Sequence, residues 1–552
     1  MSAGASGSSG ASGSNGASGS SGASGSHPPF DVAVLSRSLE RCPDPVALYA
    51  ALCHGRPDTA LLESADHSTA SGSQSLLMSR AALRIVGRGR RVTLDALSAN
   101  GRDLLAGLAR RHPEATASDT GERLVLDYPP PATGDERARL LAPSPLDAVR
   151  EAVLSLRVTG AIAPRPPLAI GAFAYDLLGV YEALPEPASD PLAWPDFELW
   201  VAEEVVAIEH DKHRATALRF VFGGITPPQN SPAYHDASRA LAELVTRIET
   251  IPAAPPPGEP PRLPPELGAE VDQDDAAYCA TVTTLKEHIR RGDIFQIVPS
   301  RSFRRPCPDA LAAYAELRAL NPSPYMFFLH GSAGQLFGAS PESALTVRGP
   351  ARRLRINPIA GTRPRGRDAS GAVDHDLDAR LEAELRLDHK EIAEHMMLVD
   401  LARNDVARVS KPGTRVVERL LDVVRYSHVM HLVSLVAGEL DDDLDALHAY
   451  VATMNMGTLV GAPKLRAASL LREHEPSRRG PYGGAVGYLT AEGELDTCIV
   501  IRSAVVQDGV AHVRAGGGVV YDSDPQAEAD ETRRKAGAVL AALRRAAEEA
   551  QP

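Results

Sequence analysis

The chain has few cysteines and no long apolar run. It contains five cysteines among 552 residues, with no CxxC pair: Cys42, Cys53, Cys279, Cys307 and Cys498. An odd number at wide spacing favours neither a disulfide framework nor a zinc site, and it predicts a reducing, cytoplasmic location. No apolar segment approaches the roughly 20 residues that span a bilayer, and the N-terminus lacks the basic start and apolar core of a signal peptide. We therefore expect no membrane association.

Positive charge is also scarce relative to negative charge. The chain has 58 Lys and Arg against 71 Asp and Glu, a formal net charge of -13. Non-specific nucleic-acid binding needs a dense positive surface that displaces counterions, so no nucleic-acid partner is expected. The hydrophobic fraction of 43% and the charged fraction of 23% are ordinary for a globular protein of two or three domains.

Composition divides the chain into four parts. Residues 1–27 are almost wholly Ser, Gly and Ala, which cannot bury enough apolar surface to fold, so we predict a disordered tail. Residues 252–269 include the run PAAPPPGEPPRLPP, and we predict an extended connector because proline fixes its backbone and lacks a donor. The connector would separate an N-terminal domain (28–251) from a C-terminal domain (270–552).

Strand and helix patterns are mixed in the N-terminal domain. Residues 80–101 predict two short strands around a Gly-rich turn, followed by the start of a helix. Residues 198–222 predict a hairpin that turns at Asp211-Lys212. Because strands and helices do not alternate regularly, the pattern favours an α+β fold over a doubly wound sheet.

Two Glu-x-x-Glu pairs lie in helical patterns of the C-terminal domain. They are Glu391 with Glu394, and Glu528 with Glu531, the latter after Pro525, which suits a helix start. A spacing of three puts each pair on one helical face. Two facing pairs would form a hard-oxygen site suited to Mg²⁺, although either pair alone is common on a solvated helix.

A glycine run and an interrupted strand indicate an anion site. Residues 515–520 (AGGGVV) follow a strand-like segment and precede the acidic helix, so backbone N–H groups could approach an anion closely. A plain turn is the alternative, and the run does not match a dinucleotide fingerprint. Arg502 interrupts the apolar run CIVIRSAVV. A buried arginine there needs an anionic partner, either in a salt bridge or in a ligand.

One further candidate is a histidine in an apolar segment. His431 lies in YSHVMHLVSLVAGEL, three residues after His428. A lone histidine in such a run is more often a core residue than a catalyst. Spacing alone does not choose between the two.

Eight short segments together resemble the ordered motifs of a known family. They are NPSPYMFF (321–328), GASPES (338–343), PIAGTRPRG (358–366), DLARND (400–405), YSHVMHLVS (426–434), GTLVGAPK (457–464), DTCIVIRSA (496–504) and PQAEADETRRKA (525–536). The family is that of the chorismate-utilising enzymes, and within it the segments most resemble anthranilate synthase large subunits. The resemblance covers 270–545 and continues weakly at 61–66 and 96–101. It implies a two-lobed α+β fold in which antiparallel sheets pack against helices.

The resemblance assigns metal and catalytic roles. Glu394 and Glu531 match Mg²⁺ ligands, and Glu391 and Glu528 lie beside the metal, where Glu391 would assist catalysis. Glu342 matches the acid that protonates the departing hydroxyl of chorismate. The other matched catalytic positions are Thr458, whose hydroxyl lines the same pocket, and His431, the active-site histidine, in preference to His428.

The resemblance also assigns substrate contacts. A dianionic substrate needs a cation, an arginine and backbone donors, and an allylic hydroxyl leaves only when a carboxyl of raised pKa protonates it. The positions that match chorismate-binding residues are Gly361, Thr362, Tyr482, Arg502, Gly516, Gly517 and Gly518.

Two positions separate the members of the family. Isochorismate and salicylate synthases have a lysine that acts on water where this chain has Gln296. Aminodeoxychorismate synthases have a nucleophilic lysine where this chain has Ala360. Both lysines are absent, so an external amine is implied, and ammonia gives anthranilate with loss of pyruvate.

The ammonia source is expected on another chain. No cysteine lies in the G-x-C-x-G elbow of a glutaminase, so a separate glutamine amidotransferase subunit (component II) is implied, usually in a heterotetramer. The alternative enzyme is an aminodeoxyisochorismate synthase, which keeps the pyruvyl group and usually carries a fused glutaminase. A non-catalytic tryptophan-sensing paralogue is the alternative from another class, but such a protein should have lost metal or acid residues.

The resemblance further implies feedback inhibition by tryptophan, bound between LLES (61–64) and NPSPYM (321–326). The N-terminal domain would thus be regulatory and partner-binding. The expected tryptophan contacts are Glu63 and Ser64 from the first segment and Pro324, Tyr325 and Met326 from the second. Relatives often have a lysine where this chain has Gln74, which would weaken inhibition.

Overall fold

The structure is a computed structural model. It describes residues 29–64, 74–118, 120–159, 165–223, 232–251, 268–368, 371–426 and 429–549. The Ser/Gly/Ala tail, nearly all of the Pro-rich connector and His428 lie outside the described residues. No helix in the described ranges is long and apolar enough to cross a bilayer.

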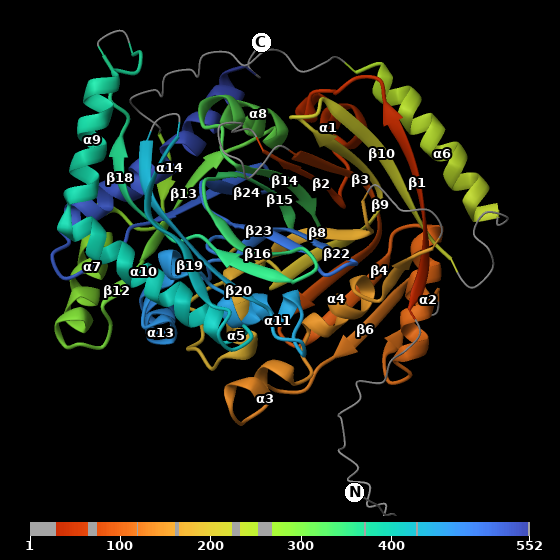
Figure 1. Cartoon of the computed structure of the whole chain (residues 1–552), viewed down its shortest axis with the longest axis horizontal. Helices are drawn as coiled ribbons and strands as arrows, with labels where there is room; N and C mark the ends of the chain where they lie inside the picture. The colour runs from red at the N-terminus through yellow and green to blue at the C-terminus, as the bar shows by residue number, and fades with distance from the viewer. Residues whose placement is uncertain are drawn as a thin grey trace, which may run out of the picture.

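One connected sheet system dominates the molecule, and it branches into two arms (Figure 1). The first arm runs through β3 (Gln74–Arg88), β2 (Thr59–Glu63), β14 (Tyr325–Gly331), β15 (Gly334–Ser340), β24 (Ser503–Gln507), β25 (Val510–Gly516) and β13 (Ser300–Pro306). The second runs through β9 (Phe197–Glu209), β8 (Leu168–Phe173), β22 (Ala485–Thr490), β23 (Leu495–Ile499), β16 (Ser343–Arg348), β17 (Arg353–Ile356) and β20 (Val429–Glu439). These pairings are antiparallel, which confirms the α+β prediction.

The junction of the arms is the pair β3 and β9. Nearly every residue of β9 is buried, because layers cover both of its faces. The predicted hairpin is confirmed: β9 ends at Glu209 and β10 (Arg214–Phe222) returns beside it. The predicted strand, turn and helix of 80–101 also form, as β3, β4 (Arg91–Ala96) and α2 (Ala99–Arg111), although β3 begins earlier than expected.

Helices cover the outer faces of the sheets. One large core lies beneath four of these helices: α1 (Pro45–Cys53), α8 (Ala310–Leu320) and α14 (Pro525–Glu549) pack on the first arm, and α6 (Pro232–Glu249) packs on β1 (Phe30–Leu39) and β10. Leu540 and Leu543 of α14 and Leu317 of α8 are buried in that core, each worth about 1.5–3 kcal/mol of transfer free energy. In Figure 1, α6 lies beside β1 and β10 at one edge of the molecule, and α9 (His375–Leu387) lies at the opposite edge.

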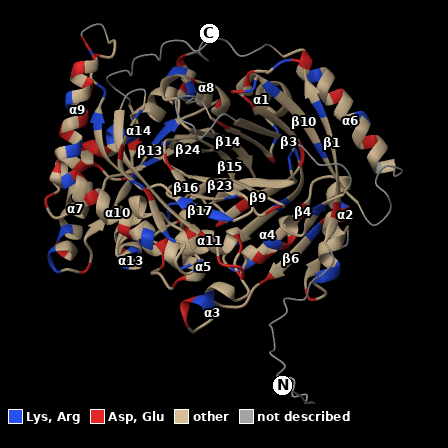
Figure 2. Cartoon of the chain, viewed as in Figure 1, with Lys and Arg blue, Asp and Glu red and all other residues tan. Residues whose placement is uncertain are grey.

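The segments before and after the connector share the sheet. Strand β2 pairs with β14, so that Glu63 lies opposite Met326, and β8 pairs with β22. The two motifs that were expected to bind tryptophan are therefore neighbours. On the outside, acidic and basic side chains are intermixed along α6 and α9 (Figure 2).

Candidate active site

Two helices carry the four predicted carboxylates. Helix α10 (His389–Ala407) begins at Asp388, whose side chain caps it, and carries Glu391 and Glu394. Helix α14 begins at Pro525, as predicted, and carries Glu528 and Glu531. Both predicted helices thus form, with each pair in the first two turns.

The four carboxylates influence one another across the two helices. Burial raises the pKa of Glu394, and the charges of Glu391 and Glu531 raise it further. Burial and then Glu531 raise the pKa of Glu528, whose buried Oε2 has no hydrogen-bond partner among the described residues. Like-charge repulsion of this kind is what a divalent cation relieves.

Three of the four carboxylates nevertheless form ion pairs with basic side chains. Glu391 pairs with Arg363 at 3.1 Å, Glu394 with a lysine one turn earlier at 3.7 Å, and Glu531 with Lys535 at 2.7 Å. Within the described ranges, no three acidic, histidine or cysteine side chains lie close enough to hold a metal ion. The oxygen donors suit Mg²⁺ chemically, but they would have to leave these ion pairs to bind it.

The glycine run lies against the Glu528 carboxyl, the Gln296 amide and the Lys535 ammonium group, and we call it the glycine wall. It follows β25, and a Cβ on Gly517 would lie 2.5 Å from Glu528 Oε2. A Cβ on Gly518 would lie 2.9 Å from Gln296 Nε2, and Lys535 Nζ donates to the Gly516 carbonyl at 3.0 Å. A side chain at Gly517 or Gly518 would therefore displace the Glu528 carboxyl or the Gln296 amide.

Arg502 lies in the gap between β23 and β24. Its φ of +50° is a conformation that non-glycine residues rarely adopt, and it marks a constrained position. Burial lowers the pKa of its guanidinium. Among the described residues it makes no salt bridge, and Nη1 donates only to the Lys535 carbonyl at 3.4 Å. This favours a ligand over a structural salt bridge, the alternative that the sequence left open.

Tyr482 lies beside the same wall. Its side chain is buried, and a Cβ on Gly516 would come within 3.2 Å of its hydroxyl. Burial raises the pKa of Tyr482, and Arg479 is the largest opposing charge. The phenol therefore stays protonated and can donate a hydrogen bond.

Glu342 is buried beyond the end of β15. Thr458, on α12 (Gly457–Val460), donates to its Oε1 at 3.0 Å and is its side chain's hydrogen-bond partner in the described structure. Burial raises the pKa of Glu342 to about 8, against the opposing effects of Thr458, Lys535 and Arg502. Glu342 is therefore mostly protonated at neutral pH and can donate a proton.

His431 lies on β20, opposite Thr362 of β18 (Ile359–Pro364). Its Nδ1 lies 3.2 Å from the Gly361 carbonyl and 3.0 Å from Thr362 Oγ1. Burial, with smaller contributions from the charges of Arg502 and Lys535, lowers the pKa of His431 to about 4, so the ring is neutral. Gly361 has φ +72°, and a Cβ there would lie 3.3 Å from Glu391 Oε2, which brings this strand to the acidic helix.

Lys535 is a central residue that the sequence analysis did not single out. It contacts Glu531 and Gly516, and its charge acts on both Glu342 and His431. Its position one turn after Glu531, on the same helical face, is the signal that could have identified it.

The predicted tryptophan contacts line a separate cavity of about 400 Å³. Glu63 is buried there, where it accepts a bond from Tyr314 at 3.0 Å and pairs with Arg318 at 2.8 Å. Glu63 Oε2 and Ser64 Oγ are buried without hydrogen-bond partners in the described structure. The cavity is also lined by Gln74, Arg165, Pro324, Tyr325, Met326, Arg348, Tyr488 and Asp496.

Comparisons with known proteins identify the family of the chain. Residues 116–541 match the chorismate binding enzyme family. The chain is 50% identical to anthranilate synthase component 1 of Vibrio cholerae, over 92% of this chain and 96% of that protein. It is 49% identical to the Escherichia coli protein of the same description, over 91% and 94%.

A solved structure gives the same result. The fold is similar to that of anthranilate synthase component I from Streptococcus pneumoniae, with a TM-score of 0.63 and 27% identity over 86% of this chain and 93% of that one. The resemblance seen in the eight sequence motifs is confirmed. The chain belongs to the family of chorismate binding enzymes.

Proposed function

We propose that this chain is the chorismate-using component of an anthranilate synthase, which converts chorismate and ammonia to anthranilate and pyruvate in tryptophan biosynthesis. Two relatives that are about 50% identical to this chain are anthranilate synthase components 1, and the similarity extends over nearly their whole length. One structural observation supports the chemistry: Glu342, whose pKa burial raises, lies close enough to feel the charge of Arg502, which lacks an ion-pair partner among the described residues.

The binding groups match a dianion. Arg502 and the Tyr482 hydroxyl would bind carboxylate oxygens of chorismate, and the backbone N–H groups at Gly517 and Gly518 would add donors. Glu394 and Glu531 would hold Mg²⁺, which supplies positive charge beside a substrate carboxylate. Glu528 and Glu391 would orient this shell.

Two groups would move protons. Glu342, assisted by Thr458, protonates the departing ring hydroxyl as ammonia adds to the ring. His431 donates its Nδ1–H to the Gly361 carbonyl, which leaves Nε2 as the basic nitrogen. That nitrogen would accept the ring proton whose loss accompanies pyruvate elimination.

We further propose a glutamine amidotransferase partner that docks on the C-terminal domain, whereas the sequence placed partner binding in the N-terminal domain. Phe295 is 67% exposed, although it directly precedes the buried Gln296 beside Gly518. A hollow of about 570 Å³ opens there, lined by Phe295, Leu401 and Pro463. Ammonia is mostly protonated in water, so a partner that docks here would deliver it over a short enclosed path.

Tryptophan inhibition is the proposed role of the second cavity. An amino-acid ligand needs a carboxylate for its ammonium group, and Glu63 Oε2 is a buried acceptor without a partner in the described structure. Arg165 Nη2 donates to Gln74 Oε1 at 2.5 Å. An arginine therefore places a positive charge beside the position at which relatives often have a lysine. Binding would shift the relative placement of the two sheet arms and so inhibit turnover.

Product analysis tests the proposed reaction. The purified chain with chorismate, Mg²⁺ and ammonium should form equal amounts of anthranilate and pyruvate. An aminated product without pyruvate would identify an aminodeoxyisochorismate synthase, and no turnover at all would identify a binding paralogue. Glutamine should replace ammonium only after a glutaminase subunit is added.

A further inference from the structure

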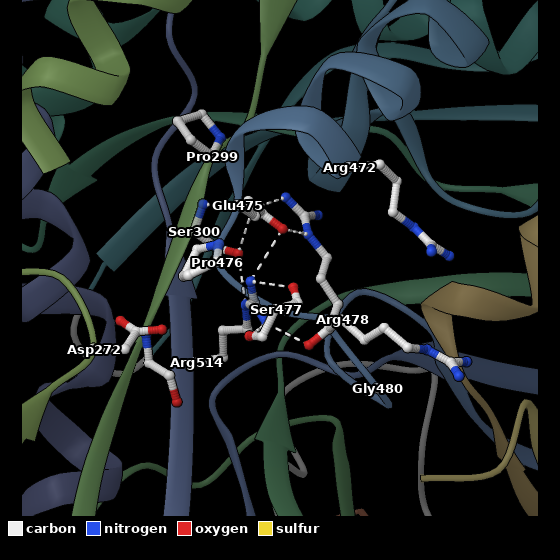
Figure 3. Close-up of polar contacts among 12 residues, drawn as sticks. Asp272, Pro299, Ser300, Arg472, Glu475, Pro476, Ser477, Arg478, Gly480 and Arg514 are labelled. Atoms are coloured by element: carbon white, nitrogen blue, oxygen red, sulfur yellow. Dashed lines mark hydrogen bonds and ion pairs between the residues drawn. The ribbon is translucent and has the colours of Figure 1, made fainter. Parts of the chain in front are cut away.

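A buried carboxylate outside the motifs ties several segments together. Glu475 follows α13 (Lys464–His474) and is buried. Its Oε1 accepts bonds from the Ser300 backbone N–H at 2.8 Å, the Ser300 hydroxyl at 2.7 Å and Arg479 Nη2 at 2.6 Å. Its Oε2 accepts bonds from Arg479 Nε at 2.8 Å and Arg514 Nη2 at 3.0 Å. Figure 3 shows Ser300 and Arg514 beside the Glu475 carboxylate, with dashed lines for the polar contacts.

Arg479 extends the network to two further segments. Its Nη1 donates to the Leu459 carbonyl at 2.7 Å, and its Nη2 donates to the Val298 carbonyl at 2.6 Å. Leu459 directly follows Thr458, the partner of Glu342, and Val298 lies two residues after Gln296. The guanidinium also lies 5.8 Å from the centre of the Tyr482 ring.

Arg514 connects the network to the glycine wall. Its Nε donates to the Ser300 hydroxyl at 2.8 Å, and its Nη1 donates to the Arg478 carbonyl at 2.7 Å. Arg514 lies on β25, two residues before Gly516, and Ser300 is the residue that pairs with Gly516 across the sheet. The same serine is thus bound by Glu475, by Arg514 and by the strand that ends in the glycines.

We propose that Glu475, with Arg479 and Arg514, is a positioning centre for the chorismate site. It fixes the backbone that carries Thr458, Gly516 and Tyr482, and it leaves two guanidinium groups against one carboxylate, a net positive charge beside a site for a dianion. The inference rests on the proposed function, because it takes these residues as the chorismate contacts.

A buried ion pair can instead be purely structural, and replacing one with apolar residues is often neutral. The hydrogen bonds of this network differ from those of a purely structural ion pair in the groups that they reach. Besides the ion pairs, and besides bonds to the backbone near Arg478, two of them reach groups next to the proposed site: the Leu459 carbonyl, which follows Thr458, and the Ser300 hydroxyl, which lies opposite Gly516 in the sheet. A displacement of about 1 Å in such contacts costs about 100-fold in rate.

The test compares Glu475→Gln with a matched control, Glu203→Gln. Glu203 is also a buried carboxylate, paired with Arg219 at 2.7 Å, and it lies on β9 of the N-terminal domain. Both variants should lower the unfolding temperature. Only Glu475→Gln should lower kcat/KM for chorismate, by about 10- to 100-fold with a raised KM.

A milder variant and a site variant complete the experiment. Ser300→Ala keeps both ion pairs and should raise the KM for chorismate about two- to tenfold, even if Glu475→Gln does not fold. Unchanged kinetics in folded Glu475→Gln and in Ser300→Ala, while Arg502→Gln loses activity, would overturn the inference and leave the site standing. An Arg502→Gln variant with wild-type KM would overturn the placement of chorismate itself, and this inference with it.

Discussion

Two regions of the molecule each bury a glutamate, and they hold it in opposite states. Around Glu342 the only side-chain hydrogen bond in the described structure comes from Thr458, and burial raises the pKa to about 8. Around Glu475 two guanidinium groups outweigh the burial and lower the pKa. Two opposite charges 4 Å apart attract by about 4 kcal/mol at an effective dielectric constant of 20, which exceeds what one neutral hydrogen bond gives.

The difference shows that the partners of a buried acid, and not its burial, decide what it can do. Glu342 keeps its proton at neutral pH and can transfer it to a leaving group. Glu475 is ionised and acts through the backbone that it holds.

Removing the transferable proton should have the largest effect. Glu342→Gln keeps the bond with Thr458 and the shape of the site, so the protein should fold normally. Its kcat should fall by about 100- to 10,000-fold, because an amide cannot act as the acid. Steady-state kinetics with thermal unfolding checks this, and near-native turnover would make Glu342 a structural residue like Glu475.

The second prediction concerns the acidic helices. Glu394→Gln and Glu531→Gln each remove a negative oxygen ligand, and activity should fall at least about 100-fold at limiting Mg²⁺, with partial recovery at high Mg²⁺. Asp530→Asn, on the same helix at an exposed position, is the control. Equal activity at limiting Mg²⁺ in all three variants would contradict the ligand assignment.

His431→Met should reduce kcat by about tenfold or more, because it removes the neutral base beside Gly361. An aminated intermediate that retains the pyruvyl group should then accumulate and be visible by chromatography. His512→Met, at a half-buried position on β25, provides the comparison. The same loss in both variants would return His431 to a packing role.

The pH dependence of the free energy of unfolding should report the protonation state of Glu342. Its pKa is about 8 in the folded protein and roughly 4.3 when unfolded, so the folded state binds more protons between these values. This group therefore makes the free energy of unfolding decrease as pH rises from about 4 to about 8. Urea titrations across this range should show a smaller decrease for Glu342→Gln, and identical slopes would indicate an ionised Glu342.

The smallest effect on catalysis should come from the second cavity. Ser64→Phe fills the space beside Glu63 and should abolish inhibition by tryptophan while kcat stays within about twofold of wild type. Tryptophan titrations of both proteins decide this. An uninhibited wild type, or a variant inhibited as strongly, would remove the regulatory proposal and leave the catalytic one.

The sequence predicted the α+β class, both acidic helices and the break in the strand at Arg502, because periodicity and motif order are local signals. It did not predict the partners. Contacts between strands that are far apart in the chain decide whether Arg502 has an ion-pair partner, and they place Glu63 opposite Met326.

The Glu475 network was beyond the sequence for the same reason. Glu475 and Ser300 are 175 residues apart, and neither lies in one of the eight motifs. Long-range hydrogen bonds of this kind leave no periodic pattern. The site's chemistry was therefore predictable from motifs, whereas the groups that position it required the structure.

Infrared difference spectroscopy tests the central contrast most directly. The spectrum of wild type minus Glu342→Gln should contain the C=O stretch of a protonated carboxyl at neutral pH, and this band should disappear with a midpoint near pH 8. The matching difference for Glu475→Gln should contain only carboxylate bands at neutral pH. A Glu342 band that is already lost below pH 5, or a protonated Glu475 at pH 7, would contradict the account.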